Sequence, residues 1–457
     1  MIRLFNVYFP TRNLVRFVCE LCLICGSLLL VTRYILGPDA YIGLIYEHGL
    51  LKIGSIAAFT ILLSYYFDLY EPRRISQRWE VYFRLLLVLS ALAFVLAGLI
   101  FFLPEFEIGH NVLFGGALIL SIVLVLWRRV DEWIVSSPFL RERIYVLGCG
   151  ARAREIVQML GVRRDAGYQV VGWSGEHSGS ESAVTLEEGL REIRNSGTVI
   201  DRIIVALEDR RRIMPINELL NFRISGVMIN DANTIVERLS GILPLEGLSP
   251  GDILFSQGFC IRAPRQIVRR SLSVLVASVG LLVCLPIIPI IALAVRLSSP
   301  GPILFRQTRV GFRGRQFTTL KFRTMRADAE ANGAVWATKG DPRITRVGRF
   351  MRKTRLDEIP QLWNVVRGDM AFVGPRPERP EFVKWLSKEI PYYDLRHMIR
   401  PGLTGWAQVR YKYGASLEET KRKLEYDLYY LKHLSVGLDL LIMFETVKTI
   451  VLRRGAQ

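Results

Sequence analysis

The sequence predicts a membrane-embedded helical bundle, then an α/β domain, then an α+β domain with a helix that re-enters the membrane. Three observations predict this order. About half of the 457 residues (51%) are hydrophobic, which is high for a soluble chain. Four apolar runs of spanning length come first, and a later run is broken by prolines. Strand and helix patterns alternate between them, so the predicted domains are residues 1–140, 141–261 and 262–457.

The four apolar runs of the first domain cover residues 14–36, 50–67, 81–103 and 112–127. Each is near the ~20 residues that cross a hydrocarbon core. Arginines stand before the first run, between the second and third, and after the fourth, whereas the other two loops carry acids. Because basic loops stay in the cytoplasm, both ends of this bundle are predicted to be cytoplasmic. The arginines are Arg3, Arg12, Arg16, Arg73, Arg74, Arg78, Arg128 and Arg129.

The cysteines and histidines predict neither a disulfide framework nor a zinc site. Cys19, Cys22 and Cys25 form a C-x-x-C-x-x-C run inside an apolar helix without a fourth ligand, which favours membrane packing over a metal cluster. The five histidines lack zinc-ligand spacing, so any metal is expected to be a hard ion on carboxylates. The net charge is +18, and many of the basic residues flank membrane runs, which favours lipid and phosphorylated substrates over nucleic acid.

The second domain reads as a small doubly wound, Rossmann-like α/β domain. A buried strand at residues 144–147 leads into Gly148–Ala153, which approximates the dinucleotide fingerprint G-x-G-x-x-A before a helix. The acid that would hold a ribose hydroxyl is absent from Gly172–Gly175, at the end of the second strand. A structural or regulatory domain that needs no NAD or NADP is therefore favoured, with a bound nucleotide as the alternative.

The third domain opens with an apolar run, Ser271–Leu297, that Pro286 and Pro289 interrupt. Proline removes a backbone donor and clashes with the preceding turn, so Pro286 is the predicted helix break. Each half would be about 20 Å long, short of the ~30 Å core. Arginines flank the run on both sides, which favours re-entry to the same membrane face. A kinked helix that crosses the membrane is the alternative.

Two sequence features of the third domain predict a site for phosphate groups. Strands at residues 303–309 and 316–322 lead into Lys321 and Arg323, whose alternate positions share one face and can meet the same phosphate. The alternative is a solvated strand face. Asp357 and Glu358 are predicted at the start of an amphipathic helix, near Arg352 and the segment Gly374–Pro377. The alternative is a helix cap beside a surface acid.

The C-terminal region adds a loop and two helices. Arg400–Gly405 reads as a tight loop with exposed backbone N–H groups, and Trp406 reads as either a base-stacking ring or a membrane-interface anchor. Helices are predicted at residues 417–434 and 438–452. The second carries Asp439, Glu445 and Lys448, so it is too polar to span and is predicted to lie along the membrane surface.

These motifs together resemble the bacterial polyprenyl-phosphate sugar-1-phosphate transferases, which initiate exopolysaccharide synthesis. The match covers residue 262 to the C-terminus, and the bundle plus α/β domain resembles the long-form members. The resemblance implies a monotopic phosphoglycosyl transferase domain. One departure is Cys284-Leu285-Pro286, where family members often have Ser-Pro. The motifs that carry the resemblance are Lys321–Met325, Leu356–Glu358, Gly374–Pro377, Arg400–Gly405, Pro377–Phe382 and Tyr413–Ser416.

The resemblance also implies an activity and residue roles. Asp357 would be the nucleophile that forms a covalent aspartyl intermediate, and Glu358 would bind Mg²⁺. A UDP-sugar and undecaprenyl phosphate would give undecaprenyl-diphosphate-sugar and UMP, with glucose or galactose favoured over an N-acetylated sugar. A multi-pass homodimer is implied in the bacterial inner membrane, with both large domains in the cytoplasm. The phosphate-binding residues implied are Lys321, Arg323, Arg352, Arg376 and Arg400.

Two other functional classes are weighed against this one. A membrane-tethered nucleotide-sugar oxidoreductase or dehydratase would need an intact cofactor fingerprint and a Tyr-x-x-x-Lys pair, and the α/β region offers neither. A non-enzymatic scaffold would explain the charge alone. It would not explain the ordered motifs of the third domain.

Overall fold

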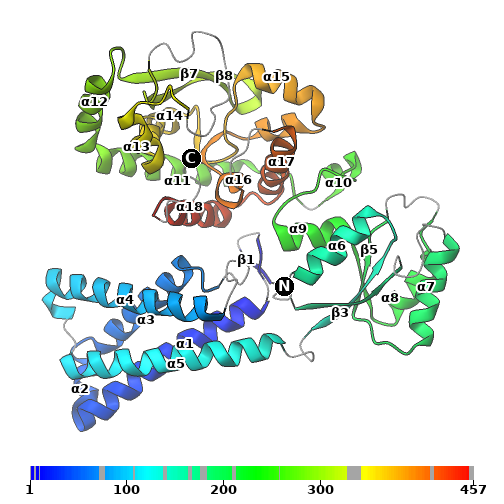
Figure 1. Cartoon of the computed structure of the whole chain (residues 1–457), viewed down its shortest axis with the longest axis horizontal. Helices are drawn as coiled ribbons and strands as arrows, with labels where there is room; N and C mark the ends of the chain where they lie inside the picture. Colours follow the sequence, from blue (N-terminus) through cyan, green and yellow to red (C-terminus); the bar gives the residue numbers. More distant parts are fainter. Residues whose placement is uncertain are drawn as a thin grey trace. The chain divides into compact units, whose positions relative to one another are not determined.

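A computed structural model of the chain describes residues 2–4, 7–9, 11–70, 78–106, 109–136, 141–162, 167–174, 183–207, 213–256, 258–326, 341–411 and 416–451. The chain divides into two compact units (Figure 1). One holds Phe9–Ala232 with Met1–Ile2, and the other holds Asn233–Gln457 with Arg3–Tyr8. The second unit begins 29 residues earlier than the predicted boundary at 261/262, because α9 (Ala232–Ser240) packs on it.

The first unit contains four long apolar helices, as predicted. All four are long and apolar enough to cross a membrane. Their shared core includes Ile24, Ala57, Val88 and Leu124, each 1% exposed or less. The bundle elements are α1 (Thr11–Leu36), η1 (Gly37–Asp39), α2 (Ala40–Ile45), α3 (Gly49–Tyr66), α4 (Arg78–Phe102), η3 (Pro104–Phe106) and α5 (His110–Ser136). The short strands β1 (Ile2–Leu4) and β2 (Val7–Phe9) precede them and fall mostly in the second unit.

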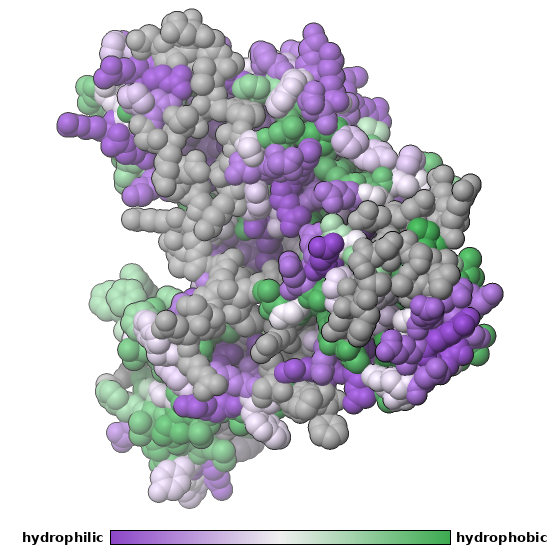
Figure 2. Space-filling view, turned by 45° about the vertical axis from the view of Figure 1, so that its right-hand side comes forward, coloured by the Kyte–Doolittle hydropathy of each residue, from purple (hydrophilic) through white to green (hydrophobic). Residues whose placement is uncertain are grey.

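The outer surface of the bundle is hydrophobic. Figure 2 shows apolar side chains over this part of the molecule, and Leu30, Phe94 and Phe114 are each more than 70% exposed. Water would make such a surface costly, whereas lipid tails would not. The surface is therefore that of a membrane protein.

Two of the arginines used to orient the bundle form ion pairs inside it. Arg128 contacts the buried Glu20 at 2.9 Å, and Arg16 contacts Asp131 at 2.8 Å. The positive-inside rule counts basic residues rather than net charge, so these pairs leave the predicted orientation unchanged. Arg73 and Arg74 lie outside the described residues.

The α/β region of the first unit holds a four-stranded parallel sheet in the order β4-β3-β5-β6. The first fingerprint glycine, Gly148, has φ +147°, and a Cβ there would lie 2.6 Å from the carbonyl oxygen of Ala206. Close packing on Ala206, the residue after β5, thus explains this glycine without a nucleotide. The elements are β3 (Glu142–Leu147), α6 (Ala151–Val162), β4 (Tyr168–Trp173), α7 (Ala183–Asn195), β5 (Arg202–Val205), α8 (Ile216–Ile224) and β6 (Met228–Asp231).

The second unit is an α+β domain with two small sheets. Antiparallel β7 and β8 confirm the two predicted strands, and β9 pairs in parallel with β10. After α9, the elements of this unit in chain order are α10 (Pro250–Phe255), α11 (Ala263–Cys284), α12 (Ile287–Ser298), β7 (Leu304–Val310), η7 (Phe312–Gly314), β8 (Gln316–Phe322), α13 (Arg346–Thr354), η8 (Leu356–Glu358), α14 (Gln361–Arg367), β9 (Ala371–Val373), α15 (Pro380–Glu389), η9 (Tyr393–Met398), β10 (Gly402–Thr404), α16 (Trp406–Arg410), α17 (Leu417–Lys432) and α18 (Val436–Val451).

The predicted helix break falls at Leu285-Pro286, between α11 and α12. Both helices pack on the same core: Ala277 of α11 and Val295 of α12 lie in one cluster with Met351 of α13. At 22 residues, α11 is about 33 Å long, longer than the predicted half. It begins at Ala263, and its first two turns carry arginines that contact the rest of the domain, including Arg270.

The last helix, α18, has an inverted arrangement of side chains. Its polar residues Asp439 and Lys448 are each 2% exposed, whereas Leu440 and Val447 are 50% exposed. Asp439 pairs with Arg269 of α11 at 2.6 Å, which accounts for one of these buried charges. A helix in water would present the opposite faces.

Trp406 differs from both sequence alternatives. It is 2% exposed, stacks on Tyr429, and donates its indole N–H to the carbonyl of Gly241 at 2.7 Å. It is neither a free stacking platform nor a membrane anchor. Glu237 of α9 adds ion pairs to Lys432 at 2.7 Å and to His433 at 2.6 Å. These contacts explain why α9 belongs to the second unit.

Candidate active site

The acid pair lies on a short turn rather than at the predicted start of a helix. Helix α13 ends at Thr354, Arg355 adopts a left-handed conformation with φ +60°, and Asp357 and Glu358 follow on the 3₁₀ turn η8. The next helix, α14, begins at Gln361, directly after Pro360. Because proline lacks an N–H and fits best before or at a helix start, it delays the helix. The predicted placement of the acids at a helix N-terminus is therefore wrong.

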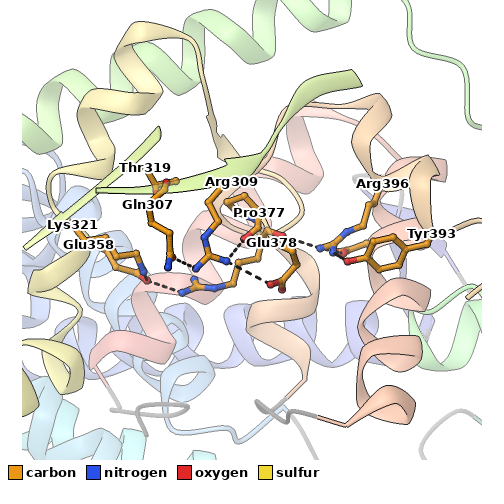
Figure 3. A network of polar contacts seen from close by, with 11 residues as sticks. Gln307, Arg309, Thr319, Lys321, Glu358, Pro377, Glu378, Tyr393 and Arg396 are labelled. Carbon is orange, nitrogen blue, oxygen red and sulfur yellow. Dashed lines mark hydrogen bonds and ion pairs between the residues drawn. The ribbon is translucent and has the colours of Figure 1, made fainter. Parts of the chain in front are cut away.

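Glu358 is held by cations from three directions. Its Oε1 accepts from Lys321 Nζ at 3.0 Å and from Arg376 Nη2 at 2.9 Å, and Arg355 Nη1 lies 3.8 Å away. Burial raises the pKa of Glu358, but the charges of Lys321, Arg376 and Arg355 outweigh burial and hold it well below the usual range. Glu358 is thus a fixed anion. Figure 3 shows Lys321 and Glu358 side by side.

Asp357 has a different environment from its neighbour. It is 7% exposed, and its buried Oδ1 has no hydrogen-bond partner among the described residues. Burial and then the negative charge of Glu358 raise its pKa, against the opposing charges of Lys321, Arg352 and Arg355. A buried carboxylate oxygen without a partner is costly in a resting fold. It is a natural position for a reacting atom.

The structure brings some of the predicted phosphate-binding residues to this pair and places others elsewhere. Lys321 and Arg376 contact Glu358, and Arg352 donates to Thr324 Oγ1 at 2.9 Å. By contrast, Arg323 donates to the carbonyls of Ser299 and Pro300, at 2.6 and 2.9 Å, so it anchors the chain after α12. Lys321 and Arg323 were predicted to share one strand face, but in the structure they contact different partners.

Arg400 also has other partners than the acid pair. Its Nε donates to the carbonyl of Gly368 at 3.2 Å, and its guanidinium lies 5.5 Å from the ring centre of Phe312. It lines a small hollow with Arg269 and Arg270 of α11. The phosphate roles of Arg323 and Arg400 remain predictions.

Sequence reasoning missed three groups near the site. Arg309 and Arg396 each donate to a carbonyl of the segment that carries Arg376, and Asp427 pairs with Arg396. No local motif marks them, because they come from β7, η9 and α17. Figure 3 shows Arg309 and Arg396 reaching the segment of Pro377 and Glu378.

The carboxylates suit a divalent ion only in part. Among the described residues, no three or more His, Cys, Asp or Glu side chains gather in a way that could hold a metal. The two acids offer oxygen ligands, and the surrounding cations discourage a metal alone. Mg²⁺ commonly uses one or two carboxylates and completes its shell with substrate phosphates and water. The residues fit a metal that arrives with a diphosphate.

Residues 264–453 match the model of the bacterial sugar transferase family. A UDP-glucose:undecaprenyl-phosphate glucose-1-phosphate transferase of Escherichia coli (strain K12) is 31% identical over 430 residues, 88% of each chain. The chain belongs to this family, and the predicted resemblance is confirmed.

Two further relatives match over smaller shares. An undecaprenyl-phosphate glucose phosphotransferase of Komagataeibacter xylinus is 32% identical over 73% of this chain and 64% of its own length. A UDP-N-acetylgalactosamine-undecaprenyl-phosphate N-acetylgalactosaminephosphotransferase of Aeromonas hydrophila is 45% identical over 42% of this chain and 45% of its own length. Family membership favours a transferase over the oxidoreductase and scaffold alternatives.

Proposed function

We propose that this protein transfers a sugar-1-phosphate from a UDP-sugar to undecaprenyl phosphate, which initiates an exopolysaccharide. The observation that carries the proposal is the contrast within the acid pair. Glu358 is neutralised by Lys321 and Arg376, whereas Asp357 keeps a buried oxygen that no described residue hydrogen-bonds. The names of the Escherichia coli and Aeromonas hydrophila relatives support the same donor and acceptor classes.

In the proposed mechanism Asp357 is the nucleophile. Its carboxylate oxygen attacks the phosphorus that carries the sugar, and the bond from that phosphorus to the bridging oxygen breaks, so UMP leaves. An oxygen of undecaprenyl phosphate then attacks the same phosphorus. The acyl-phosphate bond breaks and the carboxylate is restored. One phosphoanhydride is consumed and one is formed, so an acyl phosphate between them conserves much of the bond energy.

The cations around the pair would neutralise the diphosphate. Lys321, Arg376 and Arg355 surround Glu358, and Arg352 acts on Asp357 through its charge. Arginine suits this task because its planar fork matches phosphate oxygens. We propose that Glu358, with substrate oxygens, holds Mg²⁺. When bound, this ion would neutralise the charge that develops on the departing UMP.

The membrane arrangement follows from the second unit's apolar surface. We propose that α11 and α12 form a re-entrant pair, because both pack on one core and both expose leucines outward, such as Leu282 and Leu293. The outward apolar face of α18 would lie on the same membrane surface. Both large domains would then be cytoplasmic, where a soluble donor meets a lipid acceptor.

The α/β region is proposed as a Rossmann-like domain with a structural or regulatory role. Gly148 is explained by packing on Ala206, and Ser174 bonds with Tyr145 at 3.1 Å near the place where the ribose-binding acid would stand. Turnover is therefore expected to be independent of NAD and NADP. A homodimer stays a prediction from the family resemblance.

The function is tested by incubating the purified protein with undecaprenyl phosphate and a panel of UDP-sugars. The relatives' names divide between glucose and N-acetylgalactosamine, so the panel includes both, with galactose and N-acetylglucosamine. One donor is expected to give UMP and a lipid-linked sugar in equal amounts, with or without NAD. Release of UMP without a lipid product, or strict dependence on a nicotinamide cofactor, would count against the proposal.

Re-entry predicts the location of the C-terminus. A reporter fused after Gln457 is expected to report a cytoplasmic location, because a four-helix bundle and a re-entrant pair leave the chain on its starting side. A reporter inserted after Gly109, in a loop predicted to be periplasmic, is the matched control. If both fusions behave as periplasmic, α11 and α12 cross the membrane and the proposed topology fails.

A further inference from the structure

The segment that carries Arg376 is held through its carbonyl groups. Pro375 and Pro377 have no N–H to donate, so few backbone bonds can fix this loop from its donor side. Four successive carbonyls each accept a hydrogen bond instead. The donors are Gly402 N to Pro375 O at 2.9 Å, Arg396 Nη2 to Arg376 O at 2.9 Å, Arg309 Nη1 to Pro377 O at 3.1 Å, and Val310 N to Glu378 O at 2.9 Å.

The side chain of Arg396 is held in place by two residues outside the loop, Tyr393 and Asp427. It is 7% exposed, its Nη1 donates to Tyr393 Oη at 2.7 Å, and its Nη2 lies 2.8 Å from Asp427 Oδ2. The guanidinium also lies over the ring of Tyr393, 5.2 Å from its centre. One planar group therefore joins η9, α17 and the main chain of Arg376, as Figure 3 shows in part.

We propose that Arg396, held by Asp427 and Tyr393, is a positioning residue that fixes the main chain of Arg376 and so aims the Arg376 guanidinium at Glu358. This inference rests on the proposed function, because it gives Arg396 a part in the same reaction. Arg396 touches neither carboxylate of the acid pair in the described structure.

The contacts of Arg396 with Asp427, Tyr393 and the carbonyl of Arg376, together called the Arg396 clamp, explain why a charged pair is buried here. A buried ion pair contributes little net stability compared with apolar side chains of similar volume, so its value lies in geometry. Burial raises the pKa of Asp427 to about 6, Arg396 and Lys423 oppose this, and Glu378 adds to it. Lysine at position 396 would keep the charge for Asp427, but a single ammonium cannot present two parallel donors in a fixed plane.

The test compares Arg396→Lys with wild-type protein in lipid nanodiscs that contain undecaprenyl phosphate. We expect kcat to fall about 10-fold while the donor KM stays within about twofold, because only the aim of Arg376 changes. Lys421→Gln is the matched control, since Lys421 lies on the same helix as Asp427 and pairs with the exposed Glu418. It is expected to match wild type.

A double-mutant cycle separates positioning from general weakening of the fold. If Arg396 acts through Arg376, adding Arg396→Lys to Arg376→Gln should lower kcat no further. Multiplying losses, or a lower unfolding temperature with unchanged kcat, would overturn the inference.

Hydrogen exchange gives a readout that needs no turnover. Two backbone amides report on this loop: the N–H of Gly374 donates to Thr404 O, and the N–H of Gly402 donates to Pro375 O. Both are expected to exchange about 10-fold faster in Arg396→Lys and at the wild-type rate in Lys421→Gln. Unchanged exchange of both amides in Arg396→Lys would overturn the inference that Arg396 fixes this loop. An inactive wild-type protein with this exchange pattern would instead count against the proposed function.

Discussion

Asp357→Asn is expected to lower turnover by about 10³-fold or more, the largest effect of any single substitution in this protein. The amide keeps the shape of the side chain but removes the attacking oxygen anion. Wild-type protein given the donor alone should release UMP and gain the mass of one sugar-phosphate. The variant should do neither. Intact-protein mass spectrometry, without acceptor, measures both steps directly.

The control for this experiment is Asp394→Asn. Asp394 is an exposed carboxylate of the same domain that bonds with Ser387 at 2.7 Å. Its replacement is expected to leave both UMP release and the mass adduct intact. If Asp357→Asn keeps near-normal turnover and wild type forms no adduct, Asp357 is a buried structural acid and direct transfer to the lipid becomes the better model.

The features that the sequence predicts well depend on strong, local patterns. Apolar runs of about the length that crosses a bilayer core appear as α1, α3, α4 and α5, and Pro286 marks the end of α11 because proline acts on its own helix. The two strands β7 and β8 also match their predicted ranges within a residue. Each of these signals is carried by neighbouring residues alone.

The features that the sequence misses depend on partners distant in the chain. Trp406 reads as a surface ring, yet it is buried by Gly241, which lies 165 residues earlier. The strand pattern at Arg323 likewise gives no sign of its contacts with the carbonyls of Ser299 and Pro300, more than 20 residues earlier. The acid pair itself was found by its motif. The sequence does not predict that the pair lies on a 3₁₀ turn. The turn follows Arg355, whose backbone is left-handed, and only a glycine would have marked such a position clearly.

Glu358→Gln is expected to have the second-largest effect, a loss of about 100-fold in kcat/KM. Two causes add. Glutamine weakens a divalent ion's carboxylate site, and it leaves Lys321 and Arg376 without the charge that now holds them. A titration of rate against Mg²⁺ separates these causes. Partial recovery at high Mg²⁺ indicates that metal binding limits the variant, whereas no recovery assigns the loss to the displaced cations and removes Glu358 as a metal ligand.

The pH dependence of the same variant tests the coupling between the two acids. Asp357 must be ionised to attack, so the wild-type rate should fall as pH drops through its raised pKa, at a higher pH than for an ordinary aspartate. Burial raises this pKa first and the charge of Glu358 adds to it. In Glu358→Gln that charge is gone, and Lys321 is free to act on Asp357, so both changes lower the pKa. The acid limb of the pH–rate profile is expected to move to lower pH. A limb that stays in place, or moves to higher pH, belongs to another group and would separate Asp357 from the rate-limiting ionisation.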